Sequence, residues 1–248
     1  MNIGNWQKAT KFAFGFAAAL ALSACGSEAA VEAPAATTGE FAEGELAIPV
    51  MGEQVNIVAF GDSLFAGYGL DNPADSYPAK LQAALRARGT NASITNAGVS
   101  GDTSAAGLSR LAFVLDNMDA KPDLFILELG GNDLLRNIQP SETRSNFVSM
   151  LTILRDRDIP VLLMGMRAPP NYGLSYQAEF DAIYADLARE FDVDLIPFWL
   201  EDIYQDPSLF QSDRIHPTAE GIEELVSSTV DDIAAVLPED GEAGEKEG

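Results

Sequence analysis

The sequence predicts one α/β domain in which helices cover both faces of a parallel sheet. Short apolar runs alternate along the chain with amphipathic segments, which is the order of elements in doubly wound folds. The runs are apolar at nearly every position, as expected for strands that are covered on both sides. Roughly 190 residues lie between an N-terminal targeting segment with its linker and an acidic tail, which is enough for one well-packed domain.

Five short runs, each nearly all apolar, indicate the strands. They span Val55–Phe60, Ala92–Asn96, Leu124–Leu129, Val161–Gly165 and Val193–Pro197. Five strands with helices between them predict a three-layer α/β/α domain with a flavodoxin-like, five-stranded parallel sheet. In such sheets the functional crevice lies outside the carboxyl ends of the strands. Residues that directly follow a strand are therefore the first candidates for chemistry.

Five amphipathic segments indicate the helices. They span Tyr77–Arg88, Ser104–Asp116, Glu142–Arg157, Tyr176–Phe191 and Ala219–Leu237. In the third segment Phe147, Met150 and Leu154 recur at three-and-four spacing, which buries one helix face. Gly89 is expected to stop the first helix, and Ser141 is a candidate N-cap of the third.

Residues 1–24 predict a bacterial lipoprotein signal peptide. Lys8 and Lys11 precede an apolar stretch, 12–22, that is too short to span a bilayer. The following Leu-Ser-Ala-Cys25 resembles a lipobox, in which the cysteine receives the lipid. As the only cysteine, Cys25 has no disulfide partner. We expect a lipid-anchored, periplasm-facing protein of the bacterial cell envelope; the alternative is an ordinary signal peptide and a soluble periplasmic or secreted protein.

Composition separates the rest of the chain into a linker, the domain and a tail. Residues 25–48 are rich in Ala, Glu, Pro, Thr and Gly and predict a flexible linker; residues 49–237 form the domain, and 238–248 an acidic disordered tail. The formal net charge of −23 repels nucleic acid, so we expect no nucleic-acid partner. A metal site is not expected either, because the chain has one histidine and one cysteine.

The residues that could take part in a chemical reaction lie near the two ends of the domain. Gly61-Asp62-Ser63-Leu64 follows the first strand, and the only histidine, His216, comes three residues after Asp213. A serine hydroxyl needs a base to become a nucleophile, and an imidazole needs a carboxylate to fix its tautomer. If the chain uses a serine nucleophile, His216 must be its base. Structural roles are also open: Ser63 could be a helix N-cap, and Asp62 could shape the turn by accepting hydrogen bonds from backbone N–H groups. Asp206 is an alternative to Asp213 as the carboxylate that orients His216.

Four blocks occur in the order that is found in GDSL (SGNH) hydrolases. They are Gly61–Leu64, Asn96–Thr103, Gly130–Asp133 and Asp213–His216, and the similarity runs from about Val55 to Leu237. The stretches Glu128–Arg136, Pro169–Gly173 and Glu190–Phe198 resemble the branch of bacterial arylesterases, thioesterases I and lysophospholipases. The resemblance implies the SGNH-hydrolase fold, described above as flavodoxin-like, and a reaction that needs no cofactor.

The resemblance also implies roles for single residues. Ser63, Asp213 and His216 correspond to the catalytic residues, and the oxyanion donors correspond to the Ser63 N–H, the Gly101 N–H and the Asn132 side chain. Gly98 competes with Gly101 for the second donor position, and Asp133 and Asn96 are expected to brace loops. Tyr172 lies in a loop that matches a substrate-side loop of the branch, and Phe65 stands where relatives often have a smaller residue, so it is expected to narrow the site.

The implied activity is hydrolysis of carboxylic esters with short-to-medium acyl groups, as in an arylesterase, with a small-molecule or lipid ester as partner. Lysophospholipase or thioesterase activity is the second reading, and a carbohydrate acetyl-esterase is a third. The alternative outside the enzymes is a non-catalytic, tethered binding module. Such a module would not require this combination of residues, so their joint presence argues against it: Ser63, Gly101, Asn132, Asp213 and His216.

Overall fold

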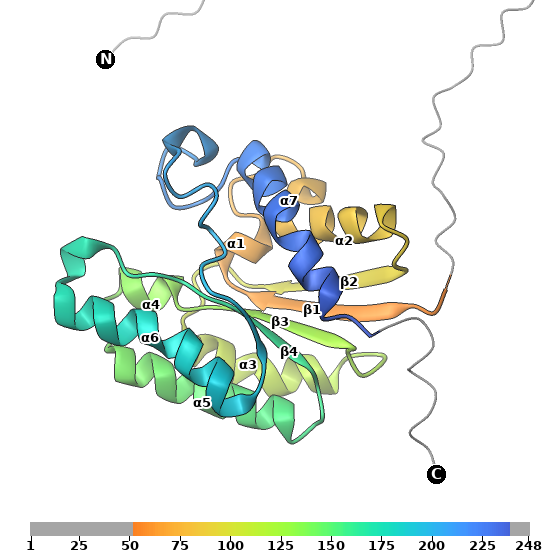
Figure 1. Cartoon of the computed structure of the whole chain (residues 1–248), viewed down its shortest axis with the longest axis horizontal. Helices are drawn as coiled ribbons and strands as arrows, with labels where there is room; N and C mark the ends of the chain where they lie inside the picture. Colours follow the sequence, from red (N-terminus) through yellow and green to blue (C-terminus); the bar gives the residue numbers. More distant parts are fainter. Residues whose placement is uncertain (1–51, 239–248) are drawn as a thin grey trace, which may run out of the picture. The chain divides into compact units, whose positions relative to one another are not determined.

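The computed structural model describes residues 52–238, which contain a parallel sheet of five strands in the order β2-β1-β3-β4-β5 (Figure 1). The strands are β1 (Val55–Gly61), β2 (Ala92–Gly98), β3 (Leu124–Glu128), β4 (Val161–Met164) and β5 (Asp194–Ile196). The predicted fold class and the five predicted strands are confirmed. The predicted signal segment 1–24, the linker 25–48 with Cys25, and the tail beyond Pro238 lie outside the described residues.

Five long helices match the predicted ones: α2 (Tyr77–Ala87), α3 (Ser104–Asp116), α5 (Pro140–Arg155), α6 (Leu174–Phe191) and α7 (Ala219–Ala235). The short helices α4 (Gly131–Leu135), η1 (Pro73–Asp75), η2 (Pro170–Tyr172) and η3 (Pro207–Leu209) were not predicted, and α1 (Ser63–Ala66) was expected only as the alternative in which Ser63 caps a helix. Gly89 does end α2, with a φ of 98°. The N-cap prediction at Ser141 is wrong: Gln139 is the N-cap, because Pro140 fits the first helical position without needing an N–H.

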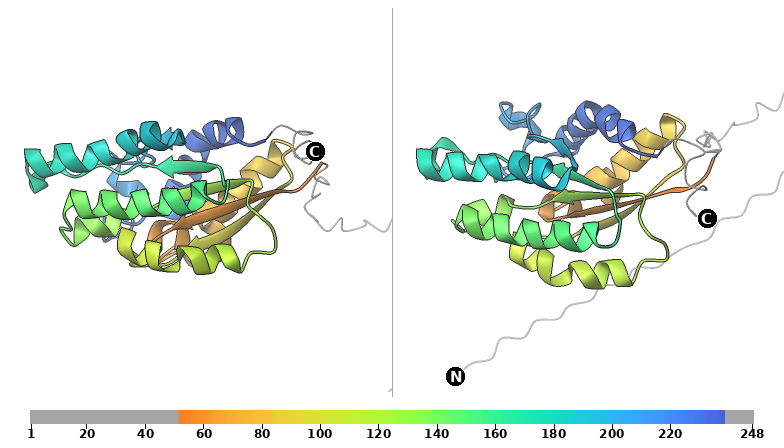
Figure 2. Two further views of the ribbon diagram at one scale, coloured as in Figure 1. Left: turned by 90° about the horizontal axis from the view of Figure 1, so that it is seen from below. Right: turned by 60° about the horizontal axis from the view of Figure 1, so that its bottom comes forward.

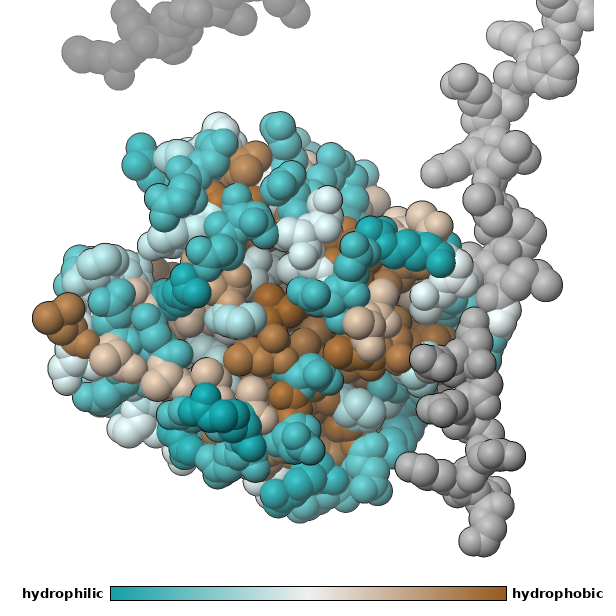
Figure 3. All heavy atoms as spheres, in the orientation of Figure 1, coloured by the Kyte–Doolittle hydropathy of each residue, from teal (hydrophilic) through white to brown (hydrophobic). Residues whose placement is uncertain are grey.

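The helices form one layer on each face of the sheet. Helices α2 and α7 lie together on one face, and α3, α5 and α6 lie on the other (Figures 1 and 2). A buried hydrogen bond of 2.7 Å between the hydroxyls of Tyr77 and Thr229 joins α2 to α7. Apolar side chains gather between the two helix layers, whereas the outward surfaces of the helices are mainly hydrophilic (Figure 3). Within residues 52–238, no helix is long and apolar enough to cross a membrane.

The central strands carry most of the core. Every residue of β3 and β4 is buried, and so is nearly every residue of β1. The edge strands β2 and β5 differ, because most of their residues are half-buried or exposed. The expectation that all five strands are covered on both faces is therefore wrong for the edges, where a strand has a neighbour on one side only.

The register of the strands brings the candidate residues to one rim. Gly61 at the end of β1 pairs with Gly98 at the end of β2, and Phe60 pairs with Leu127 of β3. The segments that follow these strands therefore leave the sheet at the same edge. A Cβ on Gly98 would lie 2.4 Å from the backbone nitrogen of Ala66, so only glycine lets α1 approach β2 this closely.

Beneath this rim lies Glu128, the last residue of β3, which is fully buried. Its Oε2 accepts a hydrogen bond of 3.2 Å from the backbone N–H of Asp62, and its Oε1 has no partner within residues 52–238. Burial, and then the nearby carboxylate of Asp62, raise the pKa of Glu128 well above its usual range. This carboxyl group is thereby favoured in its neutral, protonated form.

Replacing Glu128 with glutamine tests this protonation state, because Gln keeps the size and an acceptor but cannot titrate. A carboxyl whose folded-state pKa is raised contributes stability that is full below its unfolded pKa and lost as pH rises through its folded pKa. Between about pH 5 and about pH 9, the free energy of unfolding should therefore fall more for the wild type than for Glu128→Gln.

Urea unfolding curves at the two pH values measure this difference. The matched control is Glu190→Gln, which removes an exposed carboxylate that pairs with Arg144 and should follow the wild type. Equal loss of stability in wild type and Glu128→Gln would show that Glu128 is ionised in the folded protein.

Candidate active site

Ser63 is placed by a sharp turn at the end of β1. Asp62, not Ser63, is the N-cap of α1, and its Oδ1 accepts a hydrogen bond of 3.0 Å from the backbone N–H of Leu64. The prediction that Asp62 shapes the turn through backbone N–H groups is confirmed. Ser63 is thus the first residue of α1, with its side chain free to face the rim.

His216 is placed by a turn that precedes α7. The carboxylate Oδ1 of Asp213 accepts hydrogen bonds from the backbone N–H groups of Ile215, at 2.9 Å, and of His216, at 3.1 Å. The carbonyl oxygen of His216 in turn accepts a bond of 2.7 Å from the Gln211 N–H. These bonds fix the backbone on both sides of the ring, so the imidazole sits on a short, braced turn.

The two ends of the domain meet in a line of three side chains. His216 Nδ1 lies 2.7 Å from Asp213 Oδ2, and His216 Nε2 lies 2.8 Å from Ser63 Oγ. The rival carboxylate, Asp206, instead caps η3 by accepting from the N–H and hydroxyl of Ser208, at 2.9 and 2.6 Å. The structure therefore brings Asp213, not Asp206, to the imidazole.

The charge of Asp213 sets the role of each imidazole nitrogen. Desolvation raises the pKa of Asp213, but the hydrogen bonds from the His216 ring and from the Ile215 and His216 N–H groups outweigh it and lower the pKa to about 2. The carboxylate is therefore ionised near neutral pH and keeps a proton on Nδ1. Nε2 is left as an acceptor, in position to take the hydroxyl proton of Ser63.

One face of the imidazole is covered by Tyr68, which sequence reasoning missed. The ring centroids of Tyr68 and His216 are 4.5 Å apart, and the Tyr68 carbonyl oxygen accepts a hydrogen bond of 2.8 Å from Gln211. Tyr68 is about half exposed, and its ring lies against the imidazole of His216. No spacing rule links it to His216, because the two residues meet only through the tertiary fold.

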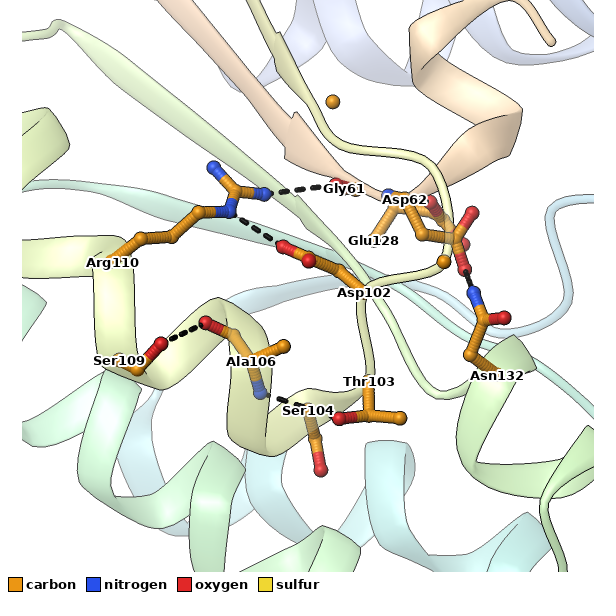
Figure 4. Close-up of polar contacts among 12 residues, drawn as sticks. Gly61, Asp62, Asp102, Thr103, Ser104, Ala106, Ser109, Arg110, Glu128 and Asn132 are labelled. Atoms are coloured by element: carbon orange, nitrogen blue, oxygen red, sulfur yellow. Dashed lines mark hydrogen bonds and ion pairs between the residues drawn. The ribbon is translucent and has the colours of Figure 1, made fainter.

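Asn132, the second residue of α4, faces the same turn. Its side-chain Nδ2 donates a hydrogen bond of 2.9 Å to Asp62 Oδ2 (Figure 4). Asp62 is almost completely buried, and burial raises its pKa, while the bonds from Leu64 and Asn132 oppose that rise. One carboxylate thus orients both the nucleophile helix and the amide of Asn132, whose second N–H stays available to a substrate.

Of Gly98 and Gly101, the two candidates for the second oxyanion donor, Gly101 has the backbone N–H that is free to donate. The N–H of Gly98 already donates to Asn96 Oδ1 at 2.9 Å, whereas neither the Gly101 N–H nor the Ser63 N–H has an acceptor within residues 52–238. The Gly101 carbonyl accepts a bond of 2.8 Å from Arg136, which holds the loop against the end of α4. The structure therefore presents two free backbone N–H groups and one amide on the same rim.

Further polar contacts fix the loops that carry these donors. Arg110 binds Asp102 Oδ2 at 2.6 Å and the Gly61 carbonyl at 3.0 Å, which ties the Gly101 loop to the end of β1 (Figure 4). Buried Asp133 accepts from the Ser104 N–H at 2.7 Å and from the Thr143 hydroxyl at 3.0 Å. The predicted bracing role of Asp133 is confirmed, and so is that of Asn96, whose Nδ2 donates to a backbone carbonyl of α1.

A cavity of about 360 Å³ opens beside Ser63 and Asn132. Its wall is mainly apolar, and includes Leu64, Leu134, Met166, Phe198, Leu200 and Phe210. The predicted loop residue Tyr172 also lines it, while the Tyr172 hydroxyl donates to the Leu134 carbonyl at 2.8 Å. The expectation that Phe65 narrows the site is wrong, because its ring is buried in the core between Tyr77 and Trp199.

The described residues offer no obvious metal site, since residues 52–238 contain no cluster of three or more His, Cys, Asp or Glu side chains that could hold an ion. What the arrangement can do chemically follows from its own groups. A hydroxyl bonded to an imidazole, beside three N–H donors and an apolar cavity, can attack a carbonyl carbon and stabilise the oxyanion that forms.

Comparisons with known proteins agree with this chemistry. The chain matches the GDSL-like lipase/acylhydrolase family over residues 59–223. Thioesterase 1/protease 1/lysophospholipase L1 of Escherichia coli (strain K12) is 42% identical over 161 residues, which cover 65% of this chain and 74% of that protein. An arylesterase of Vibrio mimicus is 39% identical over 165 residues, which cover 66% of this chain and 80% of that protein.

A solved structure extends the likeness to the fold. AlinE4, an SGNH-hydrolase family esterase, is 60% identical and superimposes with a TM-score of 0.64, over 76% of this chain and 99% of that chain. The resemblance drawn from the four sequence blocks is confirmed. Since the family match spans most of the domain and the relatives share its sequence and fold, the chain belongs to the GDSL-like lipase/acylhydrolase family and is a hydrolase with esterase activity.

Proposed function

We propose that the protein hydrolyses carboxylic esters with Ser63 as nucleophile, His216 as general base and acid, and Asp213 as the group that orients the imidazole. The observation that carries this proposal is the unbroken line from Asp213 Oδ2 through both nitrogens of His216 to Ser63 Oγ, with separations of 2.7 and 2.8 Å. A binding module that had lost catalysis would have no need to keep this alignment.

In the first half of the reaction, Ser63 Oγ attacks the ester carbonyl carbon while its proton passes to His216 Nε2. The negative charge that forms on the carbonyl oxygen is stabilised by the N–H groups of Ser63 and Gly101 and by the Asn132 amide. When the tetrahedral intermediate collapses, the bond to the alcohol breaks and His216 returns the proton to the leaving oxygen. The acyl group is then bound to Ser63 as an ester.

In the second half, water replaces the alcohol. His216 removes a proton from the water as its oxygen attacks the acyl carbon, and the same three donors stabilise the second oxyanion. Collapse of this intermediate breaks the bond to Ser63 Oγ, and His216 returns the proton to Ser63. The products are a carboxylic acid and the free enzyme, and no cofactor takes part.

The cavity supports an acyl ester with an apolar body as substrate. Its volume of about 360 Å³ is near the lower end of ligand pockets, roughly 300–1,000 Å³, which favours short-to-medium acyl groups or an aryl group. Arylesterase-like activity is therefore the first proposal. Lysophospholipase or thioesterase activity is the second, because an apolar wall also suits longer acyl chains; the sparse polar groups of this wall do not favour a carbohydrate substrate.

The pH dependence of ester hydrolysis tests the roles of His216 and Asp213. Because only the neutral imidazole accepts the Ser63 proton, the rate should fall as His216 becomes protonated at low pH. The pKa of Asp213, about 2, lies below any practical assay range, so the acid limb should show the slope of one proton. Asp213→Asn should lower kcat by about 10⁴-fold because the tautomer is no longer fixed.

The matched control is Asp206→Asn, which removes the carboxylate that competes with Asp213 in the sequence but caps η3 in the structure. It should keep both the rate and the acid limb of the wild type. A loss for Asp206→Asn as large as that for Asp213→Asn, or an acid limb that survives in His216→Ala with comparable rate, would contradict the proposal.

Asn132→Ala should lower kcat by about 10²- to 10³-fold, the usual loss for one oxyanion donor. KM should change much less, since the charge that Asn132 stabilises is present mainly in the transition state. Steady-state kinetics with an aryl ester separate the two constants. Asn117→Ala, at the C-cap of α3, is a suitable control that should behave as the wild type. A loss that lies entirely in KM would assign Asn132 to substrate binding instead.

A further inference from the structure

Arg214 stands apart from the other nine arginines of the chain in lacking an acceptor within residues 52–238. Seven of the nine pair with a carboxylate, and two donate to a backbone carbonyl. They are Arg88, Arg110, Arg144, Arg155, Arg157, Arg167 and Arg189 for carboxylates, and Arg86 and Arg136 for carbonyls. In a chain with a net charge of −23, an arginine that has neither a carboxylate nor a carbonyl acceptor among the described residues is unexpected.

The position of Arg214 connects it with the site. Arg214 lines the same cavity as Ser63 and Asn132 and lies two residues before His216. The neighbouring carboxylate of Asp213 makes no ion pair with Arg214, and its two oxygens accept hydrogen bonds from the His216 ring and from the backbone N–H groups of the turn. Arg214 is thus an exposed lining residue of the cavity whose side chain has no acceptor within residues 52–238.

The backbone at this residue is also unusual. Arg214 has a φ of 60°, in the left-handed region that residues with a Cβ adopt at a cost. A hydrogen bond of 2.9 Å from its N–H to the Gln211 carbonyl helps to hold this conformation. Glycine would fit such a turn without strain. The presence of arginine here is consistent with a use for its side chain.

The two other charged side chains that line the cavity have partners among the described residues. Arg167 pairs with Glu201 at 2.8 Å and stacks over the Phe198 ring at 5.0 Å. Asp62 is buried and bonded to Asn132. Among the described lining residues, Arg214 is thus the charged side chain that has no hydrogen-bond or ion-pair partner, against a wall that is otherwise mainly apolar.

We propose that Arg214 binds an anionic group on the alcohol side of the ester substrate. The preferred substrate is then an amphiphilic ester with an apolar body and a carboxylate, sulfonate or phosphate group on its leaving alcohol. The alcohol side is assigned because His216 Nε2 must reach the leaving oxygen, and Arg214 is carried by the turn of His216 itself. This inference rests on the proposed serine esterase function, and it adds the charge of the substrate.

The test compares 4-acetoxybenzoate with its neutral isostere 4-acetoxybenzamide. The ratio of their kcat/KM values is measured for wild type and Arg214→Gln, so that the difference in intrinsic reactivity cancels. The ratio should fall by roughly 10-fold or more in Arg214→Gln, mainly through KM, as expected for loss of a charged hydrogen bond. Arg214→Lys should give an intermediate ratio, because it keeps the charge but not the planar fork.

Two further variants make the result independent of folding effects. Arg214→Gly accepts the positive φ without strain and should lose the preference for the anionic ester as Arg214→Gln does. Arg167→Gln removes a cavity arginine that is already neutralised by Glu201, and it should keep the wild-type ratio. In the wild type, added salt should also lower the ratio, because screening weakens an exposed charge pair.

Several outcomes would overturn the inference. An unchanged ratio in Arg214→Gln and Arg214→Gly would show that Arg214 binds no anion, and an equal loss with both esters would make it a structural residue. A drop confined to esters with the carboxylate on the acyl side, such as 4-nitrophenyl hydrogen glutarate against 4-nitrophenyl butyrate, would overturn the assignment to the alcohol side. Failure of the proposed function is distinguishable, because the wild type would then hydrolyse neither aryl ester.

Discussion

The hydrogen bond of 2.8 Å between Ser63 and His216 joins residues that lie 153 positions apart, and much of the domain serves to make it. Strand β1 delivers Ser63 to the rim, and helix α7, packed on α2, fixes the turn that ends in His216. A bond from Gln211 to the Tyr68 carbonyl ties that turn to the segment after α1. The nucleophile and its base therefore come together only in the completed fold, because no local element contains both.

Three carboxyl groups near the rim have pKa values that are shifted differently, because their surroundings differ. Asp213 accepts three hydrogen bonds that outweigh its partial desolvation, so its pKa is lowered and it keeps the charge that the imidazole needs. Glu128 is buried, and one of its oxygens has no partner within residues 52–238; burial raises its pKa. Burial raises the pKa of Asp62 and its hydrogen bonds oppose that rise; these bonds also hold α1 and Asn132 together. The site thus keeps ionised charge where the reaction uses it.

The sequence predicted the five strands, the long helices and the residues that meet at the rim, because periodicity and the four blocks report local structure and residue type. Helix α4 was not predicted, and α1 was only an alternative for Ser63, since four or five residues carry no helical period. Phe65 was misplaced because burial depends on which helix face meets the core. Tyr68 and the unpartnered state of Arg214 could not be predicted, since both are set by side chains distant in sequence.

The central claim is that His216 activates Ser63 for attack, and covalent labelling measures this most directly. A fluorophosphonate should add one adduct per chain, and mass spectrometry of the digested protein should locate it on Ser63. Labelling should be absent in Ser63→Ala and slower by orders of magnitude in His216→Ala, because the hydroxyl then lacks its base. An adduct on another residue, or undiminished labelling of His216→Ala, would contradict the account.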